Sequence, residues 1–352
     1  MRALIDITHP AHAHFFRHPI RELQRRGHVV AVTVRDKDRS AELLREFGIP
    51  ATVLDKGLHG RAGAPWRILG RDAKLWWFCL HFKPDVLAAI SGMFVAHVGW
   101  AIRKPAVVWD DTEHQSLAHR ITFPFVTAVK SPDCYKLHVP GKHYLYAGTH
   151  EFSYLHPNRF TPDRRQVLAL GINPDEKYCI IRFVSWSAAH DVGAAGIEES
   201  QKVRFVRRIA EYARPYITAE GPIPPELEPY RLRIPFGMIH HVLAFAALYV
   251  GEGATMASEA AILGTPAVYV NTLKLGYIDM HTRYGLVRQA ENTAGALEHC
   301  LAWLRDPQAA QKAAEARRKL LGEKIDVTMD VVRTLEDFAA WGRKGPPGRT
   351  DP

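Results

Sequence analysis

Residues Gly251–Val270 read GEGATMASEAAILGTPAVYV, and this stretch contains the most informative structural pattern in the chain. Apolar residues up to Val250 predict a short strand, Thr255–Leu263 predict a helix, and Ala267–Val270 predict the next strand. Gly253 allows the turn after the first strand to take an unusual backbone conformation or to approach a ligand closely. The order strand, glycine turn, helix and strand is typical of a parallel α/β sheet.

The start of the predicted helix offers a binding site for an anion. Free backbone N–H groups and the positive end of the helix dipole both point at a ligand placed there. The residues predicted to form this site are Gly253, Ala254, Thr255 and Met256. Glu259, one helical turn further on, is positioned to accept hydrogen bonds from the hydroxyl groups of a ribose. The alternative is an ordinary strand–turn–helix in which small residues only permit close packing.

The N-terminal half repeats this alternation of strands and helices. Strands are predicted at Ala3–Thr8, Val29–Val34, Ala51–Leu54, Val86–Ile90 and Ala106–Trp109, and helices at Phe15–Arg26, Arg39–Phe47 and Met93–Ile102. Short connections between parallel strands imply right-handed crossovers. The first half is therefore also predicted to be a parallel sheet covered by helices.

The length of 352 residues fits two domains rather than one. The predicted fold class is α/β, with two Rossmann-like, doubly wound parallel-sheet domains that face each other across a cleft. Residues 1–150 are expected to form the first domain and residues 151–322 the second, followed by a C-terminal helix and frayed tail over residues 323–352. Sheets of this kind bind ligands at the carboxyl ends of their strands, so the cleft is the expected binding site.

Composition narrows the possible partners. The four cysteines form no CxxC pair, which argues against a disulfide framework or a zinc knuckle. The net charge of +9 is compatible with a phosphate-bearing ligand, an anionic membrane or nucleic acid. No nucleic-acid-binding motif is present, so no nucleic acid partner is expected.

No apolar run reaches the roughly 18 residues that span a bilayer. A cytoplasmic location is expected, with the inner face of the membrane as an alternative, and oligomerisation stays open.

Three histidines follow the first predicted strand in the run His9–Phe16, HPAHAHFF. A neutral imidazole suits a general base near pH 7, which makes His12 and His14 candidate catalytic bases at the end of this strand. The alternative is a helix-capping loop with solvated histidines. Zinc is less favoured, and no metal is expected.

Carboxylates cluster after the strand at Ala106–Trp109, in the run WDDTEH. Clustered acids raise one another's pKa and can supply an acid or a base, which makes Asp111 and Glu113 candidate catalytic residues. The alternative is an exposed acidic turn or the N-terminal cap of a helix.

A polar run also follows the predicted strand at Tyr178–Val184. Arg182 can neutralise a phosphate through two hydrogen bonds, and Ser185 and Ser187 can donate to phosphate oxygens. Trp186 either covers a sugar or base, or packs in the core.

The segment Trp66–Phe78 mixes cations with large aromatic residues. On a helix, Trp66, Leu69, Ala73 and Trp76 or Trp77 share one side, a pattern typical of a helix at an anionic membrane surface. The alternative is a core helix that covers the sheet.

Five segments together resemble one known group of proteins. They are residues 9–30, 107–114, 154–163, 182–193 and 251–266, of which the last is the strand–turn–helix described above. These segments are similar to GT-B-fold glycosyltransferases and to UDP-N-acetylglucosamine 2-epimerases, and in particular to a prokaryotic family of unknown function within that superfamily. The resemblance extends to about Gly322.

The resemblance implies roles for several residues. Glu259 matches the glutamate that binds the ribose, and the glycine turn before it would hold the diphosphate. His240 lies where relatives hold the nucleobase, and His190 is comparable to a histidine near the pyrophosphate. Asp111 and Glu113 are comparable to catalytic acids of the epimerases. Asp279 and His281 are further candidates for contact with the donor sugar. The epimerases have a serine-glycine-glycine run at this turn, whereas this chain has Gly251, Glu252 and Gly253.

The expected function is transfer of a sugar from a nucleotide diphosphate sugar to an acceptor hydroxyl. A UDP-sugar is the expected donor and a sugar or a lipid-linked compound the expected acceptor. The reaction is expected to be metal-independent, to invert the anomeric centre and to need no cofactor, with a place in cell-surface polysaccharide or glycolipid synthesis. The alternatives are a sugar-nucleotide 2-epimerase or hydrolase, and a non-catalytic protein that binds a sugar nucleotide or a membrane.

Overall fold

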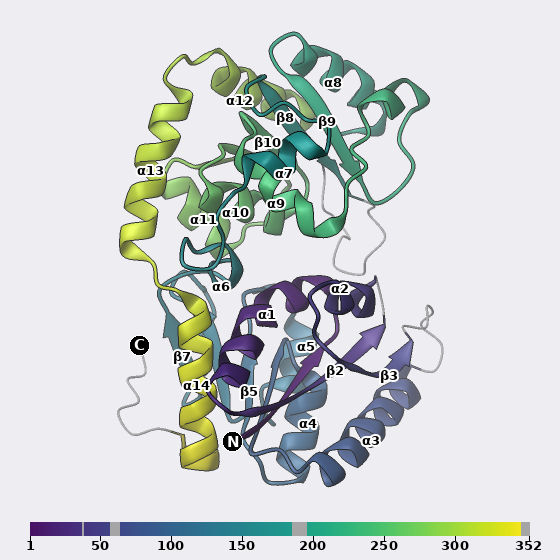
Figure 1. Ribbon diagram of the computed structural model, residues 1–352, viewed down its shortest axis with the longest axis vertical. Coiled ribbons are helices and arrows are strands. Elements are labelled where there is room, and N and C mark those ends of the chain that lie inside the picture. Colours follow the sequence, from purple (N-terminus) through teal and green to yellow (C-terminus); the bar gives the residue numbers. More distant parts are fainter. Residues whose placement is uncertain (37–38, 57–63, 185–195, 346–352) are drawn as a thin grey trace. The chain divides into compact units, whose positions relative to one another are not determined.

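The computed structural model describes residues 1–36, 39–56, 64–184 and 196–345. The chain divides into two compact units. The first unit contains Met1–Arg159 and Ile325–Pro352, and the second contains Phe160–Lys324 (Figure 1). The C-terminal helix α14 (Val327–Trp341) therefore belongs to the same unit as the N-terminus.

The first unit is built on a parallel sheet of seven strands in the order β3-β2-β1-β4-β5-β6-β7. The strands are β1 (Arg2–Ile7), β2 (Val29–Asp36), β3 (Thr52–Lys56), β4 (Val86–Ile90), β5 (Ala106–Trp109), β6 (Ala128–Pro132) and β7 (His143–Tyr146). The central strands β4 and β5 consist entirely of apolar residues, as strands covered on both faces require, and β1 is apolar apart from Arg2 and Asp6. The strand order reverses between β1 and β4, so the ends of these two strands open a crevice at that edge.

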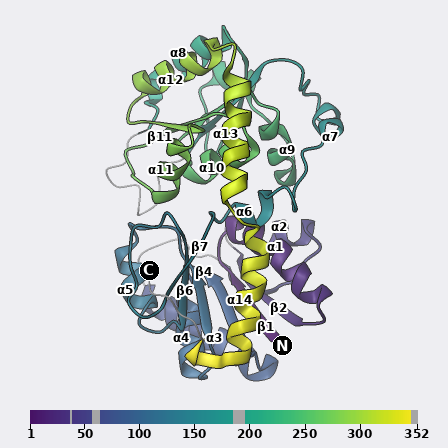
Figure 2. The ribbon, with the colours of Figure 1, turned by 90° about the vertical axis from the view of Figure 1, so that its left-hand side faces the viewer.

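Helices cover both faces of this sheet. They are α1 (Pro10–Arg25), α2 (Ser40–Glu46), α3 (Ala64–Phe82), α4 (Met93–Ala101), α5 (Ser116–Thr122) and α6 (Phe152–Leu155). Helix α4 packs against α3 and α5, and α1 packs against α2, α6 and α14. Figure 2 shows α14 alongside α1, and Glu336 of α14 forms ion pairs with Arg26 and His28 at 2.8 and 2.9 Å.

Helix α1 begins earlier than the sequence pattern predicts. It starts at Pro10, where the expected start was Phe15. Pro10 takes the first helical position, where a backbone N–H would have no acceptor within the helix, so proline loses no hydrogen bond there. The ring of His9 caps the helix by accepting a hydrogen bond from the Ala11 N–H at 3.2 Å. His12 and His14 therefore lie in the first turns of a helix rather than in a loop.

A buried ion-pair network anchors α3 to the sheet. Arg71 is 2% exposed, and its guanidinium contacts Asp6 of β1 at 2.7 Å and Asp55 of β3 at 2.7 Å. The hydroxyl of Thr33 donates to the same Asp6 carboxylate at 2.6 Å. The charge on Arg71 is therefore compensated inside the protein, as a buried charge must be.

The second unit has a five-stranded parallel sheet in the order β12-β11-β10-β8-β9. The strands are β8 (Tyr178–Phe183), β9 (Arg214–Ala219), β10 (Leu248–Gly251), β11 (Ala267–Val270) and β12 (Val287–Ala290). The strand order reverses between β8 and β10. The carboxyl ends of those two strands therefore lie at the topological switch point, which is the usual ligand site of such sheets.

Helices flank this second sheet as well. They are α7 (Arg164–Ala169), α8 (Lys202–Ala210), α9 (Ile239–Ala244), α10 (Ala254–Leu263), α11 (Gly276–Arg283), α12 (Thr293–Arg305) and α13 (Ala309–Glu323), with short 3-10 turns at Glu199–Gln201, Pro225–Tyr230 and Phe236–Met238. Helices α8 and α12 contribute Phe205, Ile209 and Cys300 to one core with the sheet. Helix α10 packs against α9, α11 and α13.

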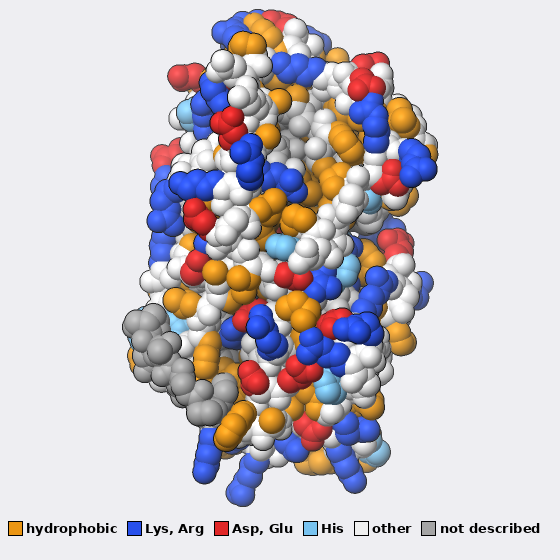
Figure 3. Space-filling model, turned by 60° about the vertical axis from the view of Figure 1, so that its left-hand side comes forward, with side chains coloured by type: hydrophobic (Ala, Val, Ile, Leu, Met, Phe, Trp, Pro, Cys, Tyr) orange, Lys and Arg blue, Asp and Glu red, His pale blue; other side chains and the backbone are white. Residues whose placement is uncertain are grey.

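Both predicted parallel-sheet α/β architectures are confirmed. On the face drawn in Figure 3, Lys and Arg side chains are dispersed among acidic and apolar ones. Positive charge on that face therefore does not gather into one continuous patch. Among the helices of the described residues, none combines the length and the apolar character that a membrane crossing requires.

Candidate active site

The turn between β10 and α10 is shaped by a glycine that has no room for a side chain. A Cβ atom at Gly251 would lie 2.6 Å from the hydroxyl oxygen of Tyr249 and 2.9 Å from the Cβ and carbonyl oxygen of Arg182. Gly253 then caps α10 with an extended backbone conformation and no side-chain hydrogen bond. The first N–H groups of the ten-residue helix α10 consequently point out of its N-terminus, where an anion can accept them.

Arg182, which the sequence analysis singled out as a candidate phosphate-binding residue, lies beside this turn. It is near the carboxyl end of β8, and its side chain is 3.8 Å from the position that a Cβ of Gly253 would occupy. One guanidinium nitrogen contacts Glu220 at 2.6 Å. The structure thus brings a cation and a helix N-terminus together at the switch point of the second sheet.

Glu259 and His240 are brought into direct contact from two helices. The Oε1 atom of Glu259 in α10 lies 2.9 Å from Nε2 of His240 in α9, and both side chains are buried. The ring of Phe160 lies against His241, the next residue of α9, at 4.7 Å between ring centroids. The contact with His240 holds the Glu259 carboxylate in one orientation.

Glu252 has a structural role that the sequence did not reveal. Its two carboxylate oxygens accept hydrogen bonds from the backbone N–H groups of Val184 and Ile197, each at 2.8 Å. It therefore fixes the two ends of the segment that follows β8. The predicted phosphate-binding residues Ser185 and Ser187, together with Trp186 and His190, lie outside the described residues.

Two further predicted contacts of the donor sugar lie in α11. His281 is fully buried, and its Nε2 atom lies 2.8 Å from the hydroxyl oxygen of Ser258 in α10. Burial, and to a lesser extent Lys324, lowers the pKa of His281 to about 3. His281 is thus a neutral residue between two helices. Asp279 occupies the first turn of α11.

In the first unit, Asp111 pairs with a histidine that sequence reasoning did not single out. The Oδ2 atom of Asp111 lies 3.0 Å from Nδ1 of His150, which is 7% exposed. Asp111 follows β5 and His150 follows β7. Within the described part of the chain, Nε2 of His150 is buried and has no hydrogen-bond partner. One signal could have found it: His150 lies in a Thr-His-Glu run just after a strand.

The pKa values of this pair move apart. Burial raises the pKa of Asp111, but the charge and hydrogen bond of His150 outweigh burial and lower it overall. Burial lowers the pKa of His150, but the charge and hydrogen bond of Asp111, with smaller effects of Glu151 and Asp110, raise it overall. Each partner therefore favours the charged form of the other.

His12 belongs to the same group of side chains. Burial first, and then the charges of His9 and His150, lower the pKa of His12 to about 3, while Asp111 opposes this shift. Its Nδ1 atom lies 3.4 Å from the hydroxyl oxygen of Thr8. His12 is therefore neutral at pH 7, and its burial makes it a weak base.

Two more buried groups complete what we call the Asp111 cluster: His12, Asp111, Tyr146, His150 and Glu151. Burial, then the charge of Asp111, raises the pKa of Glu151 to about 7. Burial, then Asp111 and Glu151, raises the pKa of Tyr146 far above its ordinary value. The cluster holds acids and bases in different protonation states around Asp111, which is typical of a site that moves protons.

The other predicted bases lie apart from these contacts. His14 packs between the rings of Phe47 and Tyr154, at centroid distances of 5.2 and 5.3 Å. Glu113 accepts a hydrogen bond from the Lys136 N–H at 3.4 Å.

The neighbouring Asp110 supports the loop after β5. This buried carboxylate accepts hydrogen bonds from the hydroxyl of Tyr135 at 2.8 Å and from the N–H of Thr112 at 3.1 Å, and it lies 3.3 Å from His119. These contacts fix the loop in which Asp111 lies. In the described ranges, no three His, Cys, Asp or Glu side chains form a group suited to a metal ion.

Solved structures of sugar-nucleotide enzymes share this architecture. The UDP-GlcNAc 2-epimerase of Neisseria meningitidis, in a structure bound to UDP-GlcNAc, matches with a TM-score of 0.68 at 13% identity, over 96% of this chain and 100% of that chain. The spinosyn forosaminyltransferase SpnP matches with a TM-score of 0.67 at 14% identity, over 97% of this chain and 99% of that chain. At these identities the likeness shows the fold. The protein has a two-domain, Rossmann-like GT-B fold.

The family follows from the sequence. Residues 1–217 match the model of the family described as protein of unknown function (DUF354), and the chain belongs to this family. The uncharacterized protein MJ0665 of Methanocaldococcus jannaschii is 25% identical over 289 residues, which cover 75% of this chain and 80% of that protein. The predicted membership in a family of unknown function with a GT-B fold is confirmed.

Proposed function

We propose that this protein is a glycosyltransferase that takes a nucleotide diphosphate sugar as donor. The observation that carries the proposal is the β10–α10 turn, where Arg182, the α10 N-terminus and the Glu259–His240 pair lie at the switch point of one sheet. A diphosphate needs cationic and N–H donors, and a ribose diol needs a fixed carboxylate acceptor. A UDP-sugar is the proposed donor, since the similar epimerase of Neisseria meningitidis binds UDP-GlcNAc.

The proposed chemistry uses the Asp111 cluster as its source of a base. Asp111, or Glu151 with its pKa of about 7, removes the proton of an acceptor hydroxyl, the oxygen attacks the anomeric carbon, and the bond from that carbon to the phosphate oxygen breaks. The nucleoside diphosphate leaves with the electron pair of that bond. Arg182 and the α10 N-terminus stabilise the negative charge that develops on this leaving group. Electrostatic stabilisation of this kind is usually the largest single contribution to catalysis. No resident metal is part of this proposal. The proposed acceptor is the hydroxyl of a sugar or of a lipid-linked compound.

A second candidate is a sugar-nucleotide epimerase or hydrolase, and one observation favours it. Glu151, with a pKa of about 7, lies close enough to Asp111 for the two charges to interact. Two acids with different proton occupancy can add and remove protons on a single sugar without an acceptor. Release of free nucleotide, or conversion of the sugar, in the absence of any acceptor would favour this candidate over transfer.

A thermal-shift screen against UDP, GDP, CDP, dTDP, ADP and their sugars tests the donor site. A ligand at 100 times its dissociation constant adds about 2.7 kcal/mol to the free energy of unfolding. We expect stabilisation by one nucleotide family, and loss of that stabilisation in Glu259→Ala. The control is Glu291→Ala, which removes an exposed carboxylate of the same unit that pairs with Lys274. Absence of any shift would remove the sugar-nucleotide proposal, and binding without turnover would indicate a non-catalytic protein.

A further inference from the structure

Helix α3 turns large apolar side chains toward solvent. Trp66 is 78% exposed and Trp77 is 63% exposed, whereas the helix buries Leu75, Cys79 and the charged Arg71. The side of α3 that carries the large apolar residues therefore faces solvent instead of packing in the core. An exposed apolar surface of this kind marks an interaction site in soluble proteins.

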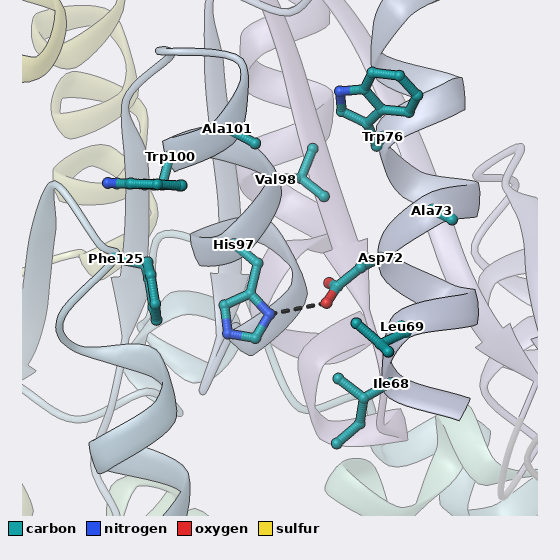
Figure 4. Close-up of a pocket in the computed structure, with 10 residues that line it drawn as sticks. All are labelled: Ile68, Leu69, Asp72, Ala73, Trp76, His97, Val98, Trp100, Ala101 and Phe125. Carbon is teal, nitrogen blue, oxygen red and sulfur yellow. Dashed lines mark hydrogen bonds and ion pairs between the residues drawn. The ribbon is translucent and has the colours of Figure 1, made fainter. Parts of the chain in front are cut away.

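This surface is hollowed into a groove between α3 and α4. The groove has a volume of about 490 Å³, and its walls are formed by Ile68, Leu69, Trp76, Val98, Trp100 and Phe125. Figure 4 shows Trp76 on the α3 side and Trp100 with Phe125 on the other side. The rings of Trp100 and Phe125 meet edge to face at 5.7 Å between centroids, which makes that wall rigid.

A single polar pair lies among the groove residues. Nδ1 of His97 in α4 lies 2.9 Å from Oδ2 of Asp72 in α3 (Figure 4). Nε2 of His97 lies 2.9 Å from the carbonyl oxygen of Ile121. This histidine ties the two helices and the end of α5 together. The remainder of the lining is apolar, so the groove suits a hydrocarbon chain rather than a polar ligand.

The helices around the groove carry a strong charge bias. In α3, α4 and α5 the one acidic residue is Asp72, which is already paired with His97. The same region carries several cations: Arg67 and Lys74 in α3, Arg120 in α5, and Arg103 just after α4. The partner that complements this surface is therefore an amphiphile with an anionic head and an apolar chain.

We propose that the groove between α3 and α4 takes an acyl chain of an anionic lipid and docks the first unit on a bilayer surface. Exposed tryptophans and flanking cations are the side chains that favour the interface of an anionic membrane. A second copy of this chain fits less well, because a two-fold symmetric contact through this surface would bring its basic residues against one another. The inference does not depend on the proposed sugar-nucleotide site, which lies in the other unit.

Vesicle binding by the full chain tests the proposal. We expect the protein to co-sediment with vesicles of phosphatidylcholine that contain about 30% phosphatidylglycerol, and not with vesicles of phosphatidylcholine alone. Added salt should weaken this binding. Trp76→Gln should weaken this binding about tenfold, the effect of losing a contact of about 1.4 kcal/mol. The matched control is Trp341→Gln, because Trp341 is 55% exposed but lies at the end of α14, outside the groove.

A fluorescence measurement distinguishes the groove from a general surface effect. Phosphatidylglycerol with brominated acyl chains should quench the tryptophan fluorescence of the wild-type protein, and the quenching should fall in the variant Trp76→Phe with Trp100→Phe. Vesicle binding that is absent, or equal in the Trp76 and Trp341 variants, overturns the proposal. Concentration-dependent dimerisation in sedimentation velocity that Trp76→Gln abolishes, without vesicle binding, overturns it in favour of a second copy.

Discussion

Nδ1 of His150 lies 3.0 Å from Oδ2 of Asp111, and this contact joins the ends of two strands that are not neighbours in the sheet. Asp111 follows β5 and His150 follows β7, while β6 lies between these strands. His150 is buried and the Asp111 side chain is 18% exposed, so the attraction between their charges is stronger than between two fully exposed groups. The pair links two loops at the carboxyl edge of the first sheet.

The first prediction is that His150 titrates above its ordinary value of 6.5 and that Asp111 is the reason. NMR titration should show a raised pKa for His150 in the wild type and a lower pKa in Asp111→Asn. A raised pKa means that this interaction stabilises the fold at low pH and that the stabilisation is lost as the pH rises through the pKa of His150. His97 provides an internal control, because its pKa is raised by Asp72 and should not respond to Asp111→Asn. An unchanged His150 pKa in that variant would contradict the assignment.

The sequence predicted most of the fold because the central strands are short, continuous apolar runs. Val86–Ile90, Ala106–Trp109 and Ala267–Val270 have the same bounds in the structure as in the sequence pattern. The strand His143–Tyr146 was missed, since its four residues HYLY include polar groups and are not a continuous buried apolar run. Because that strand was not foreseen, the polar run after it was not recognised as the end of a strand, and His150 was overlooked.

The candidate site was harder to predict because it depends on partners that are distant in sequence. Glu259 was singled out from its place in a helix, but its contact with His240 depends on how α9 packs against α10. Arg71 lies in a segment that mixes cations with aromatic residues, yet it is buried, because Asp6 and Asp55 come from two strands that α3 covers. Helical spacing shows which residues share a side, but not which side faces the sheet.

The second prediction separates two glycines of the same turn. Gly251→Ala should destabilise the protein by about 1–3 kcal/mol, because the added Cβ would collide with backbone and side-chain atoms of Arg182 and with Tyr249. Gly253→Ala should leave the free energy of unfolding nearly unchanged, since the nearest atom to its added Cβ is 3.8 Å away. Urea denaturation measures both. If Gly253→Ala also weakens nucleotide binding while folding normally, the ligand approaches this position closely; equal destabilisation of both variants would contradict the assigned geometry.

The third prediction concerns the anchor of α3. Arg71→Met should cost about 3–5 kcal/mol, because it leaves the buried carboxylate of Asp6 without its charged partner. Lys74→Met on the same helix is the control. The ammonium group of Lys74 donates to the carbonyl of Leu54 at an exposed position, so its removal should cost less than about 1 kcal/mol. Chemical denaturation of both variants gives the comparison, and similar losses would show that the buried network contributes little.

The fourth prediction is a loss of stability in acid that can be assigned to His281. Its pKa is about 3 in the folded protein because it is buried, against an ordinary value of 6.5 in an unfolded chain. The unfolded chain therefore binds the proton first as the pH falls, and the free energy of unfolding should decrease from about pH 6.5 downward, by up to about 1.4 kcal/mol per pH unit for this one group. Above pH 6.5 the contribution is fully present.

The comparison of His281→Gln with the wild type measures this contribution. Glutamine can retain a hydrogen bond to Ser258 but does not titrate, so the variant should lose stability less steeply between about pH 6.5 and pH 3.5. His81→Gln is the matched control, because it makes the same substitution at an exposed histidine near the end of α3. Urea denaturation at a series of pH values gives the slopes. If the free energy of unfolding changes with pH equally in the wild type and both variants, the imidazole of His281 has the same pKa in the folded and the unfolded protein. That result would contradict the lowered pKa of His281.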